Sequence, residues 1–261
     1  MRRFHVAIIA GALLLGGCAQ NPASTRPEPA QAVATSQSAA EVTPTPSATP
    51  TQVRSEADCS IEKCIALTFD DGPGKFTDKL LEGLKKTDAK VTFFLVGNSI
   101  AGNEDTVRRM VDEGHEVANH SFNHPDFVKV GPASAAWQLD TTSAEIQRAA
   151  GVAPKLARPP YGSFNDYTPR QNMSFVLWSV DTLDWQNRDV DIMTKNALDG
   201  AYPGGIILMH DIHEPTVKAV PALIEKLEAM GYRLVTVSKL LGDGLVLGKV
   251  YAGVRKPYPA S

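Results

Sequence analysis

The chain has 261 residues, of which 43% are hydrophobic and 21% are charged, so it can bury a sizeable core and is neither fibrous nor disordered throughout. Its formal net charge is −3, and it becomes −5 once residues 1–17, which carry two arginines and no acid, are removed. A chain this acidic is poorly suited to gripping phosphate backbones over a broad surface, and we therefore exclude nucleic acid as a partner.

Residues 1–17 are predicted to be an export signal. Two arginines precede Val6–Leu15, an apolar run that is too short to span a bilayer of about 30 Å but suits a signal peptide. The following Leu15–Cys18 resembles the bacterial lipobox, in which the cysteine is lipidated and becomes the mature N-terminus. We expect an exported lipoprotein anchored through Cys18 to the membrane or envelope and facing outward. An ordinary cleaved signal with an incidental cysteine is the alternative.

Residues 18–57 are predicted to be a lipidated, disordered tether. From residue 19 onward this stretch has no aromatic residue, and 26 of its 39 positions are Ala, Pro, Thr or Ser. Such a composition buries too little apolar area to offset the entropy of ordering the chain. The folded domain is therefore expected to start near Asp58.

Cys59 and Cys64 are the remaining cysteines of the chain. In an exported protein two cysteines this close are expected to form a disulfide, here with a structural role only. A metal site is the alternative, although no histidine or third cysteine lies nearby in the sequence.

From residue 65 onward, short apolar runs alternate with segments of helical periodicity. The expected strands are Ile65–Phe69, Val91–Val96, Glu116–Ala118, Lys155–Ala157, Phe175–Val180, Ile206–Met209 and Arg233–Val237. The expected helices lie within 76–84, 107–114, 132–151 and 217–231. This alternation predicts one α/β domain of parallel strands over residues 58–245, as an open sheet or a barrel, followed by a C-terminal tail at 246–261.

Two adjacent carboxylates, Asp70 and Asp71, follow the first expected strand. If both are ionised in a dry site they repel, so a cation or a shared proton is needed nearby. A solvated turn is the alternative, because Asp70–Pro73 also has good turn chemistry.

His120 and His124 are four residues apart, so one helical turn would aim both imidazoles at a common point. On their own, two histidines at this spacing are more often a structural pair than a metal site. With a carboxylate from another strand end they form the two-histidine, one-carboxylate set of many hydrolytic zinc sites, which leaves a position open for water.

Five segments, in order, resemble the motifs of the NodB-type polysaccharide deacetylases, carbohydrate esterase family four. They are Thr68–Pro73, His120–His124, Arg158–Gly162, Asp181–Trp185 and Ile207–Asp211. The resemblance covers residues 64 to about 242. It implies a single distorted (β/α) barrel of about seven parallel strands, one divalent metal ion, and hydrolysis of N-acetyl or O-acetyl groups on sugars.

The resemblance assigns Asp71, His120 and His124 to the metal, with zinc as our first choice and cobalt or another divalent ion as alternatives. Asp70 would be the general base that takes a proton from the attacking water, and Arg158 would hold it ionised. An ordinary ion pair is the structural alternative for Arg158.

The same resemblance makes His210 the general acid that protonates the leaving amine, with Asp184 as its partner. Tyr161 would contact the substrate by donating its backbone N–H to the oxyanion. Leu208 and Trp185 would form the walls of the acetyl pocket, although Trp185 could also be an ordinary core aromatic.

Other polar residues are given no catalytic step. Asp181 is expected to be a cap, His115 a turn residue, and His213 a residue at the rim of the site. Between Gly162 and Phe175 there is room only for a short helix interrupted by Pro169, so the barrel is expected to be thinner on that side.

Three functions compete. The preferred one is N-deacetylation of N-acetylglucosamine units in a cell-envelope polysaccharide, peptidoglycan first, by a monomeric enzyme, with chitooligosaccharide deacetylation as a variant. The second is an O-acetyl esterase of the acetylxylan type. The third is a catalytically silent sugar-binding module, which has no reason to retain both Asp70 and His210. A lipid anchor favours the first, because a tethered enzyme reaches an envelope polymer.

Overall fold

The computed structural model describes residues 56–254. The expected signal, the lipidation site Cys18 and nearly all of the expected tether lie outside these residues. Within them, no helix has the length and apolar character needed to cross a membrane.

The described strands form one sheet in which the strand pairs are parallel. The order across the sheet is β6 (Val180–Asp181), β7 (Ile206–His210), β1 (Lys63–Asp70), β2 (Thr92–Leu95), β3 (Glu116–Asn119), β4 (Leu156–Ala157), β5 (Ser174–Val176) and β9 (Val250–Tyr251). A further strand, β8 (Tyr232–Leu234), pairs with the beginning of β1. The central position of β1 agrees with its sequence, since seven of its eight residues are buried.

The chain brings the two ends of this row of strands together. β5 and β6 lie far apart in the strand order, yet only residues 177–179 separate them along the chain. Four peptide steps span at most about 14 Å, so the row from β6 to β5 must curl back on itself. These seven strands form the distorted barrel that the sequence predicts.

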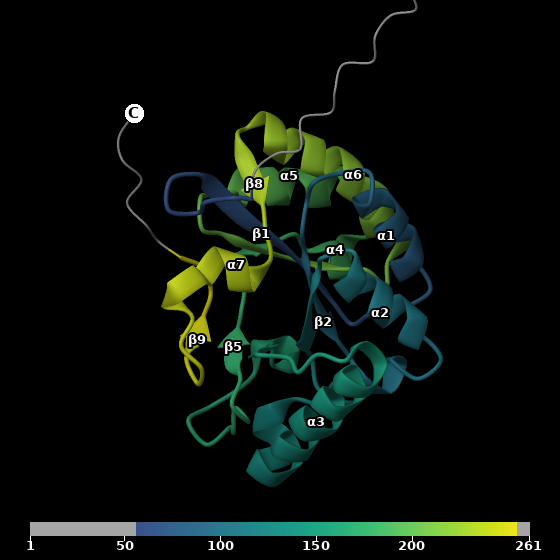
Figure 1. Cartoon of the computed structure of the whole chain (residues 1–261), viewed down its shortest axis with the longest axis vertical. Helices are drawn as coiled ribbons and strands as arrows, with labels where there is room; N and C mark the ends of the chain where they lie inside the picture. The colour runs from purple at the N-terminus through teal and green to yellow at the C-terminus, as the bar shows by residue number, and fades with distance from the viewer. Residues whose placement is uncertain (1–55, 255–261) are drawn as a thin grey trace, which may run out of the picture. The chain divides into compact units, whose positions relative to one another are not determined.

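Helices cover the outside of the barrel. They are α1 (Thr77–Leu84), α2 (Glu104–Asp112), α3 (Phe127–Ala150), α4 (Asp184–Asn187), α5 (Val190–Gly200), α6 (Glu214–Ala229) and α7 (Val237–Leu241). Contacts link α5 to α6, α6 to α1, α1 to α2 and α2 to α3, and Figure 1 shows this row running down one side of the molecule. In α6 the buried residues recur every three or four positions, so one face of the helix packs inward.

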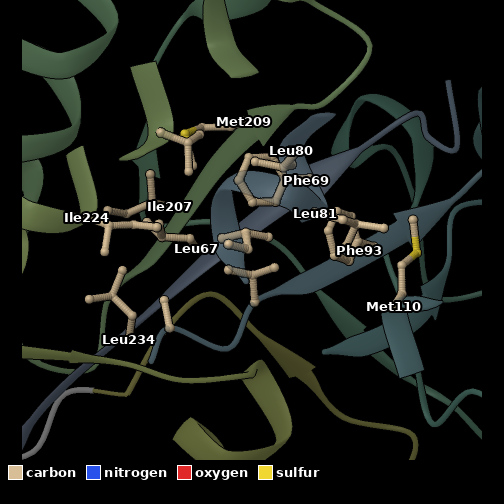
Figure 2. Close-up of a cluster of buried hydrophobic side chains, with 14 of the residues drawn as sticks. Leu67, Phe69, Leu80, Leu81, Phe93, Met110, Ile207, Met209, Ile224 and Leu234 are labelled. Atoms are coloured by element: carbon tan, nitrogen blue, oxygen red, sulfur yellow. The ribbon is translucent and has the colours of Figure 1, made fainter. Parts of the chain in front are cut away.

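The largest hydrophobic cluster fills the space between the sheet and these helices. Figure 2 shows side chains of three neighbouring strands meeting side chains of α1, α2 and α6, among them Leu67, Phe69, Leu80, Leu81, Phe93, Met110, Ile207, Met209 and Ile224. Full burial of one such side chain contributes about 1.5–3 kcal/mol. This packing fixes the strands whose carboxyl ends carry the polar residues.

Two sequence predictions about the strands are corrected. The run Phe175–Val180 is not one strand, because β5 ends at Val176 and β6 begins at Val180. Residues 177–179 connect the two strands, and Trp178 lines a cavity there. The expected strand Arg233–Val237 is shorter, because β8 ends at Leu234 and α7 begins at Val237.

The helices and the C-terminal segment also differ from expectation. α3 begins at Phe127, with Asp126 as its N-cap, and is kinked at Gly131, whose φ is +77°; Pro132 therefore begins only its second part. Residues 163–173 contain turns and no helix. Val250–Tyr251, expected in a tail, forms β9 and pairs with β5, so the sheet extends beyond residue 245.

Cys59 and Cys64 form a disulfide with an S–S distance of 2.02 Å. The bridge closes a short loop directly before the buried part of β1.

Candidate active site

The strand register brings polar residues that are distant in sequence to one edge of the barrel. Asp70 at the end of β1 is paired with His210 at the end of β7. At the end of β3, Asn119 is paired with Ala157 of β4, so His120 and Arg158 follow at the same level. Because the carboxyl ends of parallel strands share one edge, these side chains converge there.

Asp71, His120 and His124 form a cluster whose ligand atoms lie within 4.8 Å of one another. Asp71 Oδ1 lies 3.6 Å from His120 Nε2 and 3.5 Å from His124 Nε2. Atoms bound at about 2.0–2.2 Å to one tetrahedral ion are roughly 3.3–3.6 Å apart. The spacing and the donor set therefore fit a single divalent cation such as Zn²⁺.

The two histidines converge by a route that the sequence analysis predicted wrongly. Residues 120–126 are not helical, and Ser121 and His124 have positive φ values of 70° and 59°. Side chains hold this loop in place: Ser121 Oγ accepts the His124 N–H at 3.0 Å. Gln138, on α3, accepts the N–H groups of Phe122 at 2.7 Å and Asn123 at 3.0 Å. Nothing in the local pattern of residues 120–124 identifies Gln138 as a partner.

A hydrogen bond from its ring orients His120 toward the cluster. Its Nδ1 donates to the backbone oxygen of Arg158 at 2.7 Å, with the tautomer assigned from that carbonyl acceptor. Nε2 is thereby left facing Asp71. Burial lowers the pKa of His120 far below its usual value, which favours the neutral imidazole that a metal requires.

Asp70 forms a buried ion pair with Arg158, at 2.7 Å between Oδ1 and Nη1. The guanidinium is fully buried and also donates to Thr68 Oγ1 at 2.9 Å and to the Val176 carbonyl at 2.9 Å. It stacks on the ring of Phe94 at 4.1 Å. Burial raises the pKa of Asp70, while the charge of Arg158 opposes that rise. Asp70 is thus a stronger base than an exposed aspartate, and the Arg158 guanidinium holds its carboxylate in place.

His210 is held by Asp184, whose Oδ1 accepts from Nδ1 at 2.9 Å. The other carboxylate oxygen accepts the His210 backbone N–H and Thr216 Oγ1, both at 2.8 Å. Burial alone would lower the pKa of His210, but the hydrogen bond and charge of Asp184 outweigh it and raise the pKa to about 9. Burial likewise opposes the ionised form of Asp184, yet its bonds to His210 bring its pKa below the usual value.

A cavity of about 380 Å³ opens onto these groups. Eleven residues line it, and Arg158 and Asp184 are not among them. They are Asp70, Asp71, His120, His124, Pro159, Tyr161, Trp178, Asp181, Trp185, Leu208 and His210. Leu208 is buried, whereas Tyr161 and Trp185 are exposed. Tyr161 has a φ of +60°, and its ring packs edge-on against His124 with centroids 4.6 Å apart.

Comparisons with known proteins agree with this geometry. Residues 57–175 match the family model described as polysaccharide deacetylase. A solved structure described as "T48 deacetylase with substrate" is 45% identical to the chain, with a TM-score of 0.72, and the match covers 75% of this chain and all of that one. The chain belongs to the polysaccharide deacetylase family.

Two further relatives show the range of this family. The chain is 40% identical over 191 residues to the peptidoglycan-N-acetylglucosamine deacetylase PgdA of Listeria monocytogenes, covering 72% of this chain and only 41% of that protein. It is 31% identical, with a TM-score of 0.66, to a Bacillus anthracis protein described as a CE4 family pseudoenzyme, covering 73% of this chain and 69% of that one. Membership of the polysaccharide deacetylase family therefore does not by itself prove turnover.

The remaining polar residues of this polysaccharide deacetylase domain have structural contacts. Asp181 Oδ1 accepts the N–H of Leu183 at 2.9 Å. His115 is buried, accepts the Val91 N–H at 3.3 Å and packs edge-on against Phe93. His213 is half-buried at the start of α6, with its ring 6.0 Å from that of His210.

Asp211 is a buried carboxyl group that the sequence analysis did not single out. It accepts a hydrogen bond from Thr77 Oγ1, and burial raises its pKa to about 7. A Cβ at position 72 would lie 2.5 Å from its Oδ1, so only glycine fits between Asp71 and the following proline. Trp178, Gln138 and Thr216 are the other site residues recognised only once the fold is known.

Proposed function

We propose that the chain is a metal-dependent hydrolase that removes N-acetyl groups from N-acetylglucosamine units of a cell-envelope polysaccharide, with peptidoglycan as the first substrate. The observation that carries this proposal is the meeting of three groups in one cavity. They are the Asp71, His120 and His124 cluster, Asp70, which is paired with Arg158, and His210, which is paired with Asp184.

Asp71, His120 and His124 would hold the ion, and their spacing and their set of one carboxylate and two imidazole donors support zinc or another divalent metal. A divalent ion bound there would supply a Lewis acid that activates water and polarises the acetyl carbonyl.

Asp70 would accept the proton of the attacking water. Its carboxylate oxygen Oδ2 faces His120 Nε2 at 3.6 Å, so it lies beside the same cluster. Its raised pKa supports this role, because a base whose pKa is closer to the working pH takes a proton more readily.

His210 would deliver a proton from Nε2 to the leaving amine, because Nδ1 is engaged by Asp184. An amine leaves poorly as an anion, so the acid must be charged, and the pKa of about 9 keeps it charged at neutral pH. Acid and base catalysis of this kind is worth about 10²–10⁴-fold each.

Tyr161 and the apolar walls would orient the acetyl group. We propose that the Tyr161 backbone N–H hydrogen-bonds the developing oxyanion, which such donors stabilise by about 3–4 kcal/mol. Leu208 and Trp185 line the same cavity and would enclose the methyl group.

The substrate proposal draws on the Listeria relative, which is described as acting on peptidoglycan N-acetylglucosamine. We further propose that the chain is an exported monomeric lipoprotein anchored through Cys18 and facing outward. The apolar run and the small residues that precede Cys18 support the anchor. A silent module is disfavoured because both the base and the acid are present with their partners.

The test is acetate release by the purified chain from peptidoglycan, from N-acetylglucosamine oligomers and from acetylated xylan, measured in parallel. Release from peptidoglycan at the highest rate is the expected result. Preference for acetylated xylan would favour the O-acetyl esterase. If no substrate releases acetate, the enzyme proposal fails and a binding module remains.

A further inference from the structure

Two loops carry His120, His124, Arg158 and Tyr161 of the proposed site, and they have little regular structure to support them. Residues 120–126 follow β3, and residues 158–163 follow β4. Positive φ values at Ser121, His124 and Tyr161 show that neither loop continues a strand or an α-helix. Contacts between the two loops therefore help to set their relative position, alongside the bonds that Gln138 makes to the first loop.

Three contacts join the loops. At the inner end, His120 Nδ1 bonds to the Arg158 carbonyl at 2.7 Å. In the middle, the rings of His124 and Tyr161 pack edge-on at 4.6 Å. At the outer end, Ser163 Oγ donates to Asp126 Oδ1 at 2.6 Å.

Asp126 is itself rigidly placed. Its carboxylate caps α3 by accepting the Val128 N–H at 3.1 Å, and its backbone oxygen accepts from Lys129 and Val130. The bond from Ser163 is a charge-assisted one, which is roughly twice as strong as a neutral hydrogen bond. Pro125 separates Asp126 from His124 and stiffens the connection.

We propose that Asp126 and Ser163 are a pair of positioning residues that fixes Tyr161 relative to His124. Ser163 lies two residues after Tyr161, and Asp126 lies two residues after His124. The Ser163–Asp126 hydrogen bond therefore joins the two loops close to Tyr161 and His124. It would keep the proposed oxyanion donor at a fixed distance from the proposed metal ligand. The proposal rests on the function proposed above, and neither residue touches the substrate or the ion.

Lys129 provides a matched control. Its Nζ lies 3.1 Å from the other oxygen of Asp126, but its side chain is 81% exposed. An exposed pair of this kind contributes little. Lys129→Ala thus removes a partner of the same carboxylate without touching the link between the loops.

The experiment compares Ser163→Ala, Ser163→Thr, Asp126→Ala, the double variant Asp126→Ala/Ser163→Ala and Lys129→Ala in the full chain. We expect Ser163→Ala to lower kcat about tenfold with KM changed less than about twofold, because a misplacement of about 1 Å can cost up to about 10²-fold. Ser163→Thr keeps the hydroxyl and should recover most of kcat. The double variant should be no slower than the slower single variant, since both substitutions remove the same hydrogen bond. Lys129→Ala should resemble the unmodified chain.

A second readout does not depend on turnover. In the Co²⁺-loaded protein, the visible absorption reports the geometry of the ligands, and we expect it to change in Ser163→Ala but not in Lys129→Ala. Unchanged kcat and an unchanged spectrum in Ser163→Ala would overturn the proposal. A rise in KM with unchanged kcat would also overturn it, as would a fall in kcat of the same size in Lys129→Ala. If the unmodified chain releases no acetate at all, the proposed function fails, while the Co²⁺ spectra still test the positioning pair. Thermal unfolding of each variant identifies any that fails to fold.

Discussion

The contact between Asp184 and His210 leads to a sharp prediction for Asp184→Asn. The substitution keeps the size of the side chain but removes the charge that holds His210 protonated. Burial then acts on His210 with less opposition, so its pKa should fall from about 9 to the ordinary 6.5 or below. A fall of about 2.5 units corresponds to about 3 kcal/mol.

The sign of the effect on activity follows from the role proposed for His210 as the general acid. Turnover needs the protonated imidazole, so it is lost as the pH rises through the pKa of His210. Near pH 7.5 the protonated fraction would fall roughly tenfold in Asp184→Asn. The alkaline limb of the profile should move toward lower pH by about 2.5 units. A bound cation would oppose the charge of His210 in both proteins alike, so it leaves this difference unchanged.

The assay is kcat for acetate release measured across about pH 5–10. Thr216→Val serves as the control, because it removes only the bond to the second oxygen of Asp184 and should move the limb by less than about one unit. Circular dichroism and thermal unfolding show whether each variant folds. An Asp184→Asn protein whose alkaline limb stays in place at unchanged activity would refute the assigned role of the pair.

Three further predictions follow from single contacts. Asp70→Asn should abolish acetate release while bound metal, measured by elemental analysis, stays near one per chain; retained turnover would remove Asp70 as the base. Replacing Cys59 and Cys64 with alanine should lower the free energy of unfolding by about 2 kcal/mol in urea, since the bridge closes a short loop; an unchanged midpoint would show that the bridge is not stabilising. Burial lowers the pKa of His115 to about 4, so as the pH falls the imidazole takes up a proton in the unfolded state before it does so in the folded state. The free energy of unfolding should therefore fall as the pH drops from about 6.5 to about 4. His115→Phe should weaken that dependence, and an equally steep dependence in the variant would contradict the assignment.

The parts of the fold that the sequence predicts are those governed by local pattern. The buried runs that become β1, β2 and β7 are continuous and apolar, as expected for strands covered on both faces. Since parallel strands share one carboxyl edge, their polar termini could be placed together without knowing any distance.

Other features depend on contacts that no local pattern contains. Leu177 and Trp178 continue the apolar run of β5, yet their environment is the cavity and the Arg158 guanidinium, which interrupts the strand. α5 escaped prediction because its buried positions are Met193, Thr194 and Ala197, a weak apolar stripe. The spacing of the histidines predicted a helix for the loop after β3, whereas its course is set by Gln138, which lies on the following helix α3 and 16 residues beyond Phe122.

The central claim is that Asp71, His120 and His124 share one divalent ion on which hydrolysis depends. It is tested most directly by removing metal with a chelator and titrating Zn²⁺ back while following acetate release and bound metal together. We expect release to vanish on chelation and to return in full at one equivalent per chain, and His124→Ala to bind the ion far more weakly. Acetate release that persists in the metal-free protein, or unchanged metal binding in His124→Ala, would contradict the account.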